Sequence, residues 1–221
     1  MARVAADMPL LAETMAASPH ALGLAMLQAD PHAFRLDHAS QCAAVSDALA
    51  DGAAAAADLR KRFPVLPPQE IARELRVPVE TTDDDPMVGS IWRFAEYRSR
   101  PPRIVLYNRG LAPLEHALAG DLGTRLLGQA TPQDVFIAHE LYHHAEATRS
   151  AVPIARHYQP TLLRIGRWRW RTGIAALAEI AAGAFAQSLL DLPCHPKVLD
   201  FIVVEAVVPK PEERTKLQSA T

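Results

Sequence analysis

The spacing of hydrophobic residues changes along the chain and divides it into segments. Residues 1–62 are dominated by Ala and Leu, and their spacing predicts a helical region that is broken near Gly52. The prolines within residues 63–68 predict a boundary, because proline stops one helix and often opens the next. A short amphipathic helix should follow, since Ile71 and Leu75 stand four positions apart on one helical face.

Beyond this helix the pattern changes to that of β-strands. Three segments, at residues 77–82, 90–98 and 103–109, are rich in β-branched and aromatic residues. The residues between the last two segments include two prolines and are typical of a hairpin connection. The pattern therefore predicts a small, mostly antiparallel sheet.

Helical spacing then returns in two segments. Residues 111–128 have a helical pattern that internal glycines weaken and that Gly128 ends. Residues 172–193 predict a long helix of small and apolar residues, closed by Asp191 and Pro193.

Between these two segments, Thr131 marks the start of another helix. Its hydroxyl can cap the first turn, Pro132 occupies the first helical position, and Asp134 places a negative charge near the positive end of the helix dipole. Nothing interrupts the helical pattern before about Arg149.

Composition and charge narrow the class of protein. The chain has 221 residues, of which 49% are hydrophobic, so one domain with a sizeable core is expected. We expect an α+β fold with a helical N-terminal extension at 1–62, a main domain at 63–208 and a flexible polar tail at 209–221. The two cysteines, Cys42 and Cys194, are too far apart to indicate a disulfide framework and are expected to be buried thiols.

Neither a membrane nor a nucleic acid is an expected partner. Asp7, Pro9 and Glu13 interrupt the apolar N-terminus, and no apolar run reaches the roughly 18 residues of a membrane span. A net charge of −2 gives no electrostatic footprint for nucleic acid. We therefore expect a soluble, cytoplasmic protein.

One local stretch differs from the rest of the chain in charge. Four arginines interleave with Trp168 and Trp170 in residues 164–171. Such a mixture can bind single-stranded nucleic acid or phosphates. We favour a solvated face whose two tryptophans turn into the core or into an interface.

The sequence HELYH, at residues 139–143, carries the strongest chemical signal. With the nine histidines and twelve glutamates of this chain in random order, an HExxH pattern would arise in about one sequence in fifty. On a helix, His139 and His143 lie one turn apart on one face, so both imidazoles can reach a single metal ion. Glu140 projects beside them, where a carboxylate can act as the general base for a water molecule.

A catalytic zinc site usually has a third protein ligand. Glu179 is the best candidate because it is the only carboxylate in the apolar stretch 173–190, and a lone Glu among alanines is either exposed or paired with a cation. Small residues on its helical face would let the two helices approach closely. The alternatives are Glu146, His144, His157 and His195, of which Glu146 lies on the same face as the two motif histidines.

These motifs together resemble the ImmA/IrrE-type metallopeptidases. The resemblance rests on AHELYHH, on a later E-x-x-A-x-x-F-A that begins at Glu179, and on the SLLDLP that follows. The preceding order is similar too, with EIARELRVPVE as helix and strand and RIVLYN as a strand ending in Asn. The resemblance covers about residues 68–193, although the intervals before His139 and after His143 are longer than the family pattern.

The resemblance implies a zincin-like fold and a gluzincin-like zinc site. His139, His143 and Glu179 would bind Zn²⁺, and Glu140 would be the general base. Members of the family are bacterial or phage-related, and some cleave repressors, so the expected function is hydrolysis of peptide bonds in a protein or peptide substrate. The alternative is a non-catalytic relative whose zinc pins two helices while the protein binds a partner. Glu140 favours the enzyme, since a structural site has no use for a base beside the metal.

The predicted strand at 90–98 suggests how a substrate would bind. An exposed sheet edge beside the motif helix can accept a peptide as an added strand, through main-chain hydrogen bonds.

Overall fold

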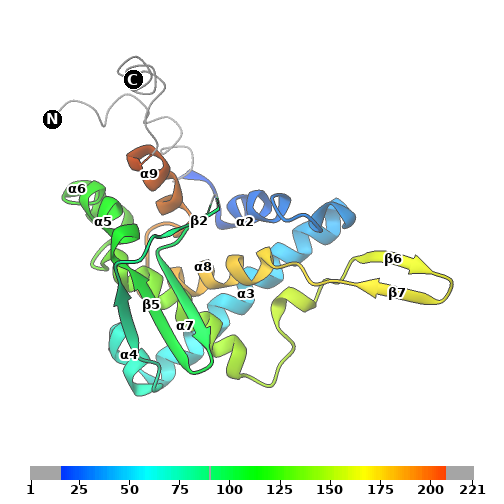
Figure 1. Cartoon of the computed structure of the whole chain (residues 1–221), viewed down its shortest axis with the longest axis horizontal. Coiled ribbons are helices and arrows are strands. Elements are labelled where there is room, and N and C mark those ends of the chain that lie inside the picture. Colours follow the sequence, from blue (N-terminus) through cyan, green and yellow to red (C-terminus); the bar gives the residue numbers. More distant parts are fainter. Residues whose placement is uncertain (1–15, 90, 208–221) are drawn as a thin grey trace, which may run out of the picture.

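The computed structural model describes residues 16–89 and 91–207 and combines helices with small sheets (Figure 1). The expected α+β class is confirmed at this level. The predicted tail at 209–221 and the first fifteen residues of the predicted N-terminal extension lie outside the described residues. The described helices are α2 (Pro19–Gln28), α3 (His38–Arg62), α4 (Pro68–Glu74), α5 (Asn108–Ala117), α6 (Asp121–Leu127), α7 (Pro132–Thr148), α8 (Ala176–Leu190) and α9 (Val198–Val207).

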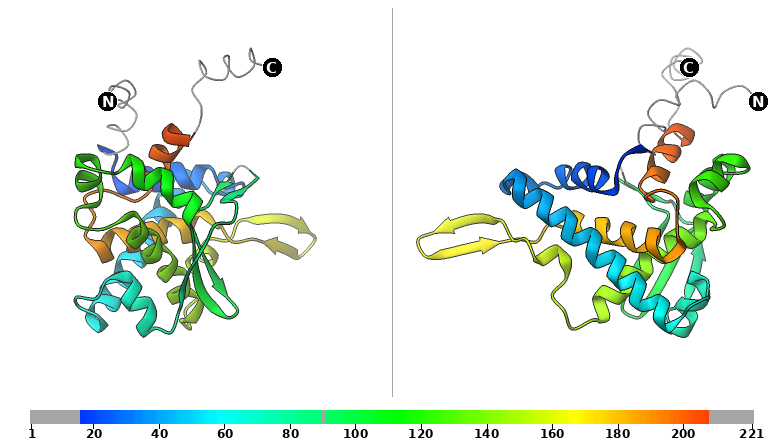
Figure 2. Two further views of the ribbon diagram at one scale, coloured as in Figure 1. Left: turned by 60° about the vertical axis from the view of Figure 1, so that its left-hand side comes forward. Right: turned by 180° about the vertical axis from the view of Figure 1, so that it is seen from behind.

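Helix α8 is the centre of the helical part and packs against both α3 and α7 (Figure 2). Its residues are mostly small, and Ala181, Ala182 and Ala186 are fully buried. Helix α3 does not break at Gly52, contrary to the sequence prediction. Gly52 instead faces α8 so closely that a Cβ atom there would lie 2.1 Å from the carbonyl oxygen of Ala181. The glycine is therefore required by a helix contact and not by a turn.

The N-terminal helices belong to the same hydrophobic core as the rest of the chain. Leu27 of α2 and Val45 of α3 are fully buried in one cluster with Ile180 of α8. The proline-rich segment at 63–68 does separate α3 from α4, as predicted.

The main sheet has three strands in the order β1 (Val79–Thr82), β5 (Pro102–Tyr107) and β4 (Ala95–Ser99). Strands β4 and β5 form the predicted hairpin, but β1 pairs with β5 in parallel, so this sheet is mixed and not mostly antiparallel. Strand β5 takes the central position because its last four residues are buried. Strands β1 and β4 contain only half-buried and exposed residues.

The segment predicted as one strand at 90–98 is divided in two, and Ser90 lies outside the described residues. Its first part, β3 (Ile91–Trp92), pairs with β2 (Met87–Val88), and only β4 joins the main sheet. The interruption turns Phe94 inward, where its ring stacks on Phe136 of α7 with 4.4 Å between ring centroids. The packing of Phe94 on the motif helix therefore interrupts the strand that the sequence pattern predicts at 90–98.

A long hairpin leaves the body of the protein between α7 and α8 (Figures 1 and 2). It consists of β6 (Thr161–Ile165) and β7 (Trp168–Arg171). The predicted inward turn of the tryptophans is wrong, because Trp168 is 80% exposed and Trp170 is 69% exposed. The hairpin extends away from the body, so no other described element covers the two rings. None of the described helices is both long enough and apolar enough to cross a bilayer.

The contact at Gly52 generates a stability prediction. Replacing Gly52 by Ala should lower the free energy of unfolding by about 3 kcal/mol, because the new methyl group meets a backbone carbonyl that cannot move aside cheaply. Urea denaturation followed by circular dichroism measures the change. The matched control is Ala54→Gly on the exposed side of the same helix, which should cost only about 1 kcal/mol. A Gly52→Ala protein as stable as the parent would contradict the close contact.

Candidate metal centre

The motif helix α7 starts as its sequence predicts. The Thr131 hydroxyl accepts the backbone N–H of Asp134, and the Asp134 carboxylate accepts the backbone N–H of Thr131, which together form a capping box. The helix runs from Pro132 to Thr148. It places the rings of His139 and His143 side by side, with their Nε2 atoms 3.3 Å apart.

Glu179 reaches this pair of histidines from the first turn of α8. One carboxylate oxygen of Glu179 lies 3.2 Å from Nε2 of His139, and the other lies 3.6 Å from Nε2 of His143. The three side chains predicted as metal ligands therefore meet at one point, where one ligand atom from each lies within 4.8 Å of the others.

The spacing of these atoms fits a tetrahedral ion. Two ligands that each lie about 2.05 Å from zinc at a tetrahedral angle are separated by about 3.3 Å. The 3.3 Å between the two Nε2 atoms matches this value, and the two carboxylate oxygens of Glu179 lie 3.2 and 3.6 Å from one Nε2 atom each. The donor set of two imidazoles and one carboxylate also suits zinc, although other divalent transition metals bind the same donors.

The candidate ligands lie beside a cleft of about 750 Å³. His139, Glu140 and Glu179 line this cleft together with His195. The side chain of Glu179 is 53% exposed, so the site opens to solvent on its side. The remaining walls are largely apolar and come from α2, α7, α9 and the strands β3 and β4, with Leu22, Met26, Trp92, Phe94, Phe136 and Phe201 as the large side chains.

Glu140 is buried beside the two histidines and is only 7% exposed. Burial raises the pKa of its carboxyl group to about 7, against the opposing effects of the charge on His139 and of the backbone N–H of Tyr97. A carboxyl group with a pKa near neutrality can both accept and return a proton at physiological pH.

The three candidate ligands shift one another's pKa values. Burial by itself would lower the pKa of His139, but the hydrogen bond to Glu179 and the charges of Glu140 and Glu179 raise it. Burial by itself would raise the pKa of Glu179, but the hydrogen bond and charge of His139 lower it to about 2. Burial and the neighbouring charge of His139 lower the pKa of His143 to about 4. The raised pKa of His139 means that protons compete with a metal ion for this ligand more strongly than they would at a free histidine.

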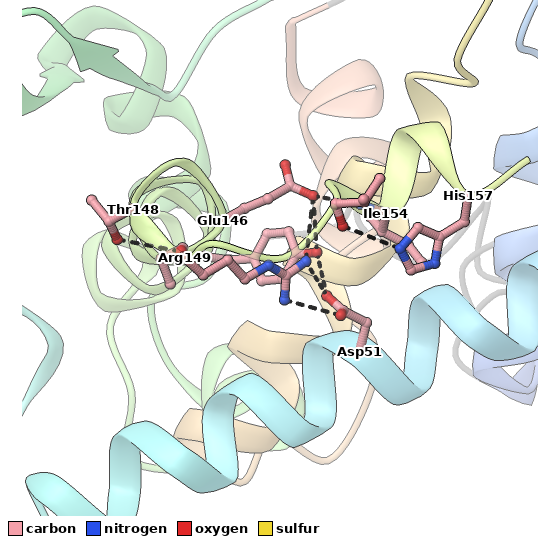
Figure 3. Close-up of polar contacts among 9 residues, drawn as sticks. Asp51, Glu146, Thr148, Arg149, Ile154 and His157 are labelled. Atoms are coloured by element: carbon pink, nitrogen blue, oxygen red, sulfur yellow. Dashed lines mark hydrogen bonds and ion pairs between the residues drawn. The ribbon is translucent and has the colours of Figure 1, made fainter. Parts of the chain in front are cut away.

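Three of the four alternative ligands lie elsewhere. His144 turns toward the sheet, with its Nδ1 3.0 Å from the hydroxyl of Tyr97. The Nε2 atom of His157 lies 3.1 Å from the carbonyl oxygen of Val152. Glu146 accepts the backbone N–H of Ile154 (Figure 3) and is not among the residues that line the cleft.

Glu146 belongs to a polar cluster that joins the end of α7 to α3 (Figure 3). Arg149 donates two hydrogen bonds of 3.0 Å to the carboxylate of Asp51, one to each oxygen. The hydroxyl of Tyr142, whose side chain is buried, donates to the same carboxylate at 2.6 Å. Such a bidentate, charge-assisted contact fixes the orientation of α7 next to its metal-binding turn. No sequence motif signals this contact, because it joins residues about ninety positions apart.

His195, the fourth alternative ligand, is buried beside the candidate site. It is 3% exposed and lines the cleft. Its ring lies against Gly183, where a Cβ atom would come within 2.6 Å of Nε2. Its Nδ1 accepts the backbone N–H of Lys197, and burial lowers its pKa to about 4, so the ring is neutral and carries its proton on Nε2. That N–H has no partner among the described residues.

Tyr158 contacts α3 through its hydroxyl group. Its hydroxyl donates to Asp47 of α3 at 2.7 Å, and this hydrogen bond raises its pKa to about 12.

No family model, no curated protein and no solved structure matches the chain.

The geometry predicts which substitutions remove the metal. Zinc measured by mass spectrometry on purified protein should be about one per chain and should fall at least tenfold in His139→Ala, His143→Ala and Glu179→Ala. His157→Ala is the matched control and should keep its zinc, because that ring lies outside the cluster. Zinc affinity should also fall as the pH decreases, since protons compete at His139. Full zinc content in Glu179→Ala would exclude this ligand set.

Proposed function

We propose that the chain is a zinc-dependent peptidase of the ImmA/IrrE type that cleaves a specific regulatory protein. The observation that supports this proposal most is the meeting of His139, His143 and Glu179 within reach of a single metal ion, with Glu140 buried beside them. The open cleft also supports it, because a structural site usually closes its fourth position with another protein ligand. When bound, zinc would supply a positive charge to the reacting carbonyl group and lower the pKa of a water molecule.

Glu140 has the position and the pKa of a general base. Its carboxylate takes a proton from the attacking water and then delivers that proton to the leaving amine. The backbone N–H of Tyr97 stabilises the charged form of Glu140, while burial opposes it, so the proton can move in either direction near neutral pH.

Strand β4 offers the backbone groups for an extended substrate. It pairs only with β5 among the described residues, and the N–H of Tyr107 donates to the carbonyl of Phe94. Hydrogen bonding alternates along an antiparallel pair, so the amide groups of Ala95 and Tyr97 point away from β5. Those of Ala95 lie beside the cleft, where a peptide can add as a further strand.

His195 supplies a hydrogen-bond donor on the other wall of the cleft. Its neutral ring presents an Nε2–H group that has no acceptor among the described residues, so it is available to the oxygen on which negative charge develops. Glu179 and Gly183 are one turn apart on α8, and the ring of His195 lies against Gly183, so His195 and Glu179 line the same cleft.

The role of Glu140 is tested with Glu140→Gln, which keeps the shape of the side chain and removes its basicity. Cleavage of a protein or peptide substrate should fall at least a hundredfold, while zinc content stays near one per chain. In the zinc-loaded parent protein, kcat/KM should decrease as the pH falls through the pKa of Glu140, which the charge of the zinc lowers from its value of about 7 in the metal-free protein. A Glu140→Gln protein that retains parental activity would contradict the proposal.

The role of His195 is tested with His195→Ala and His195→Gln. Because the donor acts on charge that develops during the reaction, His195→Ala should lower kcat by about a hundredfold with little change in KM or zinc content. His195→Gln, whose amide can still donate, should recover part of the loss. Loss of zinc in either variant would identify His195 as a ligand and not as a donor.

A further inference from the structure

The hairpin of β6 and β7 projects from the protein on a fixed base (Figure 1). At the base, Arg35 donates to the carbonyl oxygen of Thr161, and the N–H of Thr172 donates to the carbonyl of Pro160. Ile174, which follows the hairpin, is fully buried. The hairpin is therefore held firmly where it leaves the body, while its strands extend beyond it.

The two faces of this hairpin differ in chemistry. Leu163 lies opposite Trp170, and Ile165 lies opposite Trp168, so these four side chains share one face. All four are exposed, between 49% for Leu163 and 80% for Trp168. Arg164 and Arg169 lie opposite each other and share the other face.

The charge of the hairpin is entirely positive. Residues 161–171 contain four arginines and no carboxylate, in a protein whose net charge is −2. None of the four forms an ion pair with any other described residue. Like charges directly opposite each other destabilise a strand pair, and an isolated two-stranded hairpin is only marginally stable in water. A partner that is negatively charged and also accepts apolar side chains would complement both faces of the hairpin.

We propose that this hairpin binds the surface of membranes that contain anionic phospholipids. The face formed by Leu163, Ile165, Trp168 and Trp170 enters the boundary between headgroups and acyl chains, where tryptophan is favoured. Arg164 and Arg169 stay on the headgroup side and contact lipid phosphates. The hairpin does not span the bilayer, since five residues of strand extend only about 17 Å.

The separation of the two faces favours a lipid surface over the other possible partners. A single-stranded nucleic acid would need the arginines and the tryptophans on one face, so that one strand could contact both. A second copy of the chain would bring two sets of four arginines within about one Debye length, roughly 8 Å, without any acidic residue in either hairpin. A lipid interface accepts an apolar face and a basic face at different depths.

Flotation with vesicles tests this proposal on the full chain. Vesicles of phosphatidylcholine with 30% phosphatidylserine should bind at least tenfold more tightly than pure phosphatidylcholine vesicles, because each arginine near an anionic surface contributes about fivefold. The double variant Trp168→Ala/Trp170→Ala should bind at least tenfold more weakly. Val65→Ala is the matched control, since Val65 is equally exposed on the body, and it should bind normally.

Tryptophan fluorescence locates the contact directly. Trp92 is the only tryptophan outside the hairpin, so a Trp92→Phe protein reports on Trp168 and Trp170 alone. Its emission should move to shorter wavelength with anionic vesicles, and lipids brominated on the acyl chain should quench it. Glu140→Gln should bind vesicles like the parent protein, which separates this proposal from the peptidase.

Four results would overturn the lipid proposal. They are equal binding to neutral and anionic vesicles, vesicle binding that survives the double tryptophan variant, and tighter binding to a single-stranded oligonucleotide that the same variant abolishes. The fourth is dimerisation that the double variant abolishes, in the absence of vesicle binding.

Discussion

The close approach of α8 to its two neighbouring helices is the constraint on which the candidate site depends. Gly52 lets α3 come within backbone contact of Ala181, and the small residues of α8 let α7 pack on another side. Only at this short distance can Glu179 reach the two histidines of α7. Gly183 extends the same principle, because its missing side chain leaves the space that His195 fills. A larger residue at either glycine would displace a helix or a ring that shapes the cleft.

A second requirement is that buried charges near the site be held in place. Asp51, Tyr142 and Arg149 form a connected set of hydrogen bonds, so the end of α7 is tied to α3 by geometry as well as by apolar contact. On the opposite side of α7, His144 contacts Tyr97 of the sheet. The helix that carries the motif is thus fixed from both sides, which limits the freedom of His139 and His143 before any ion binds.

Neighbouring residues in the sequence are sufficient to predict where the motif helix begins. Features that depend on packing between distant parts of the chain cannot be predicted in this way. Thr131, Pro132 and Asp134 predicted the start of α7 because capping depends only on neighbouring residues. Glu179 could be found as a lone carboxylate in an apolar helix. Gly52 was misread as a helix break because a glycine at a helix crossing has the same local pattern. His195 carries no local signal, and the parallel pairing of β1 depends on which strand is most deeply buried.

The position of the hairpin in the chain has a consequence for how the protein could be divided. The hairpin lies between His143 and Glu179 in sequence, and its tip is the exposed turn at Gly166 and Arg167. A single cut at this tip would leave both histidines and Glu140 on one fragment and Glu179 with His195 on the other. The fragments would then be joined by the packing of α8 on α3 and α7, and by any ion bound between them. A metal ion bound by residues of both fragments would link them, so their association would depend on metal concentration.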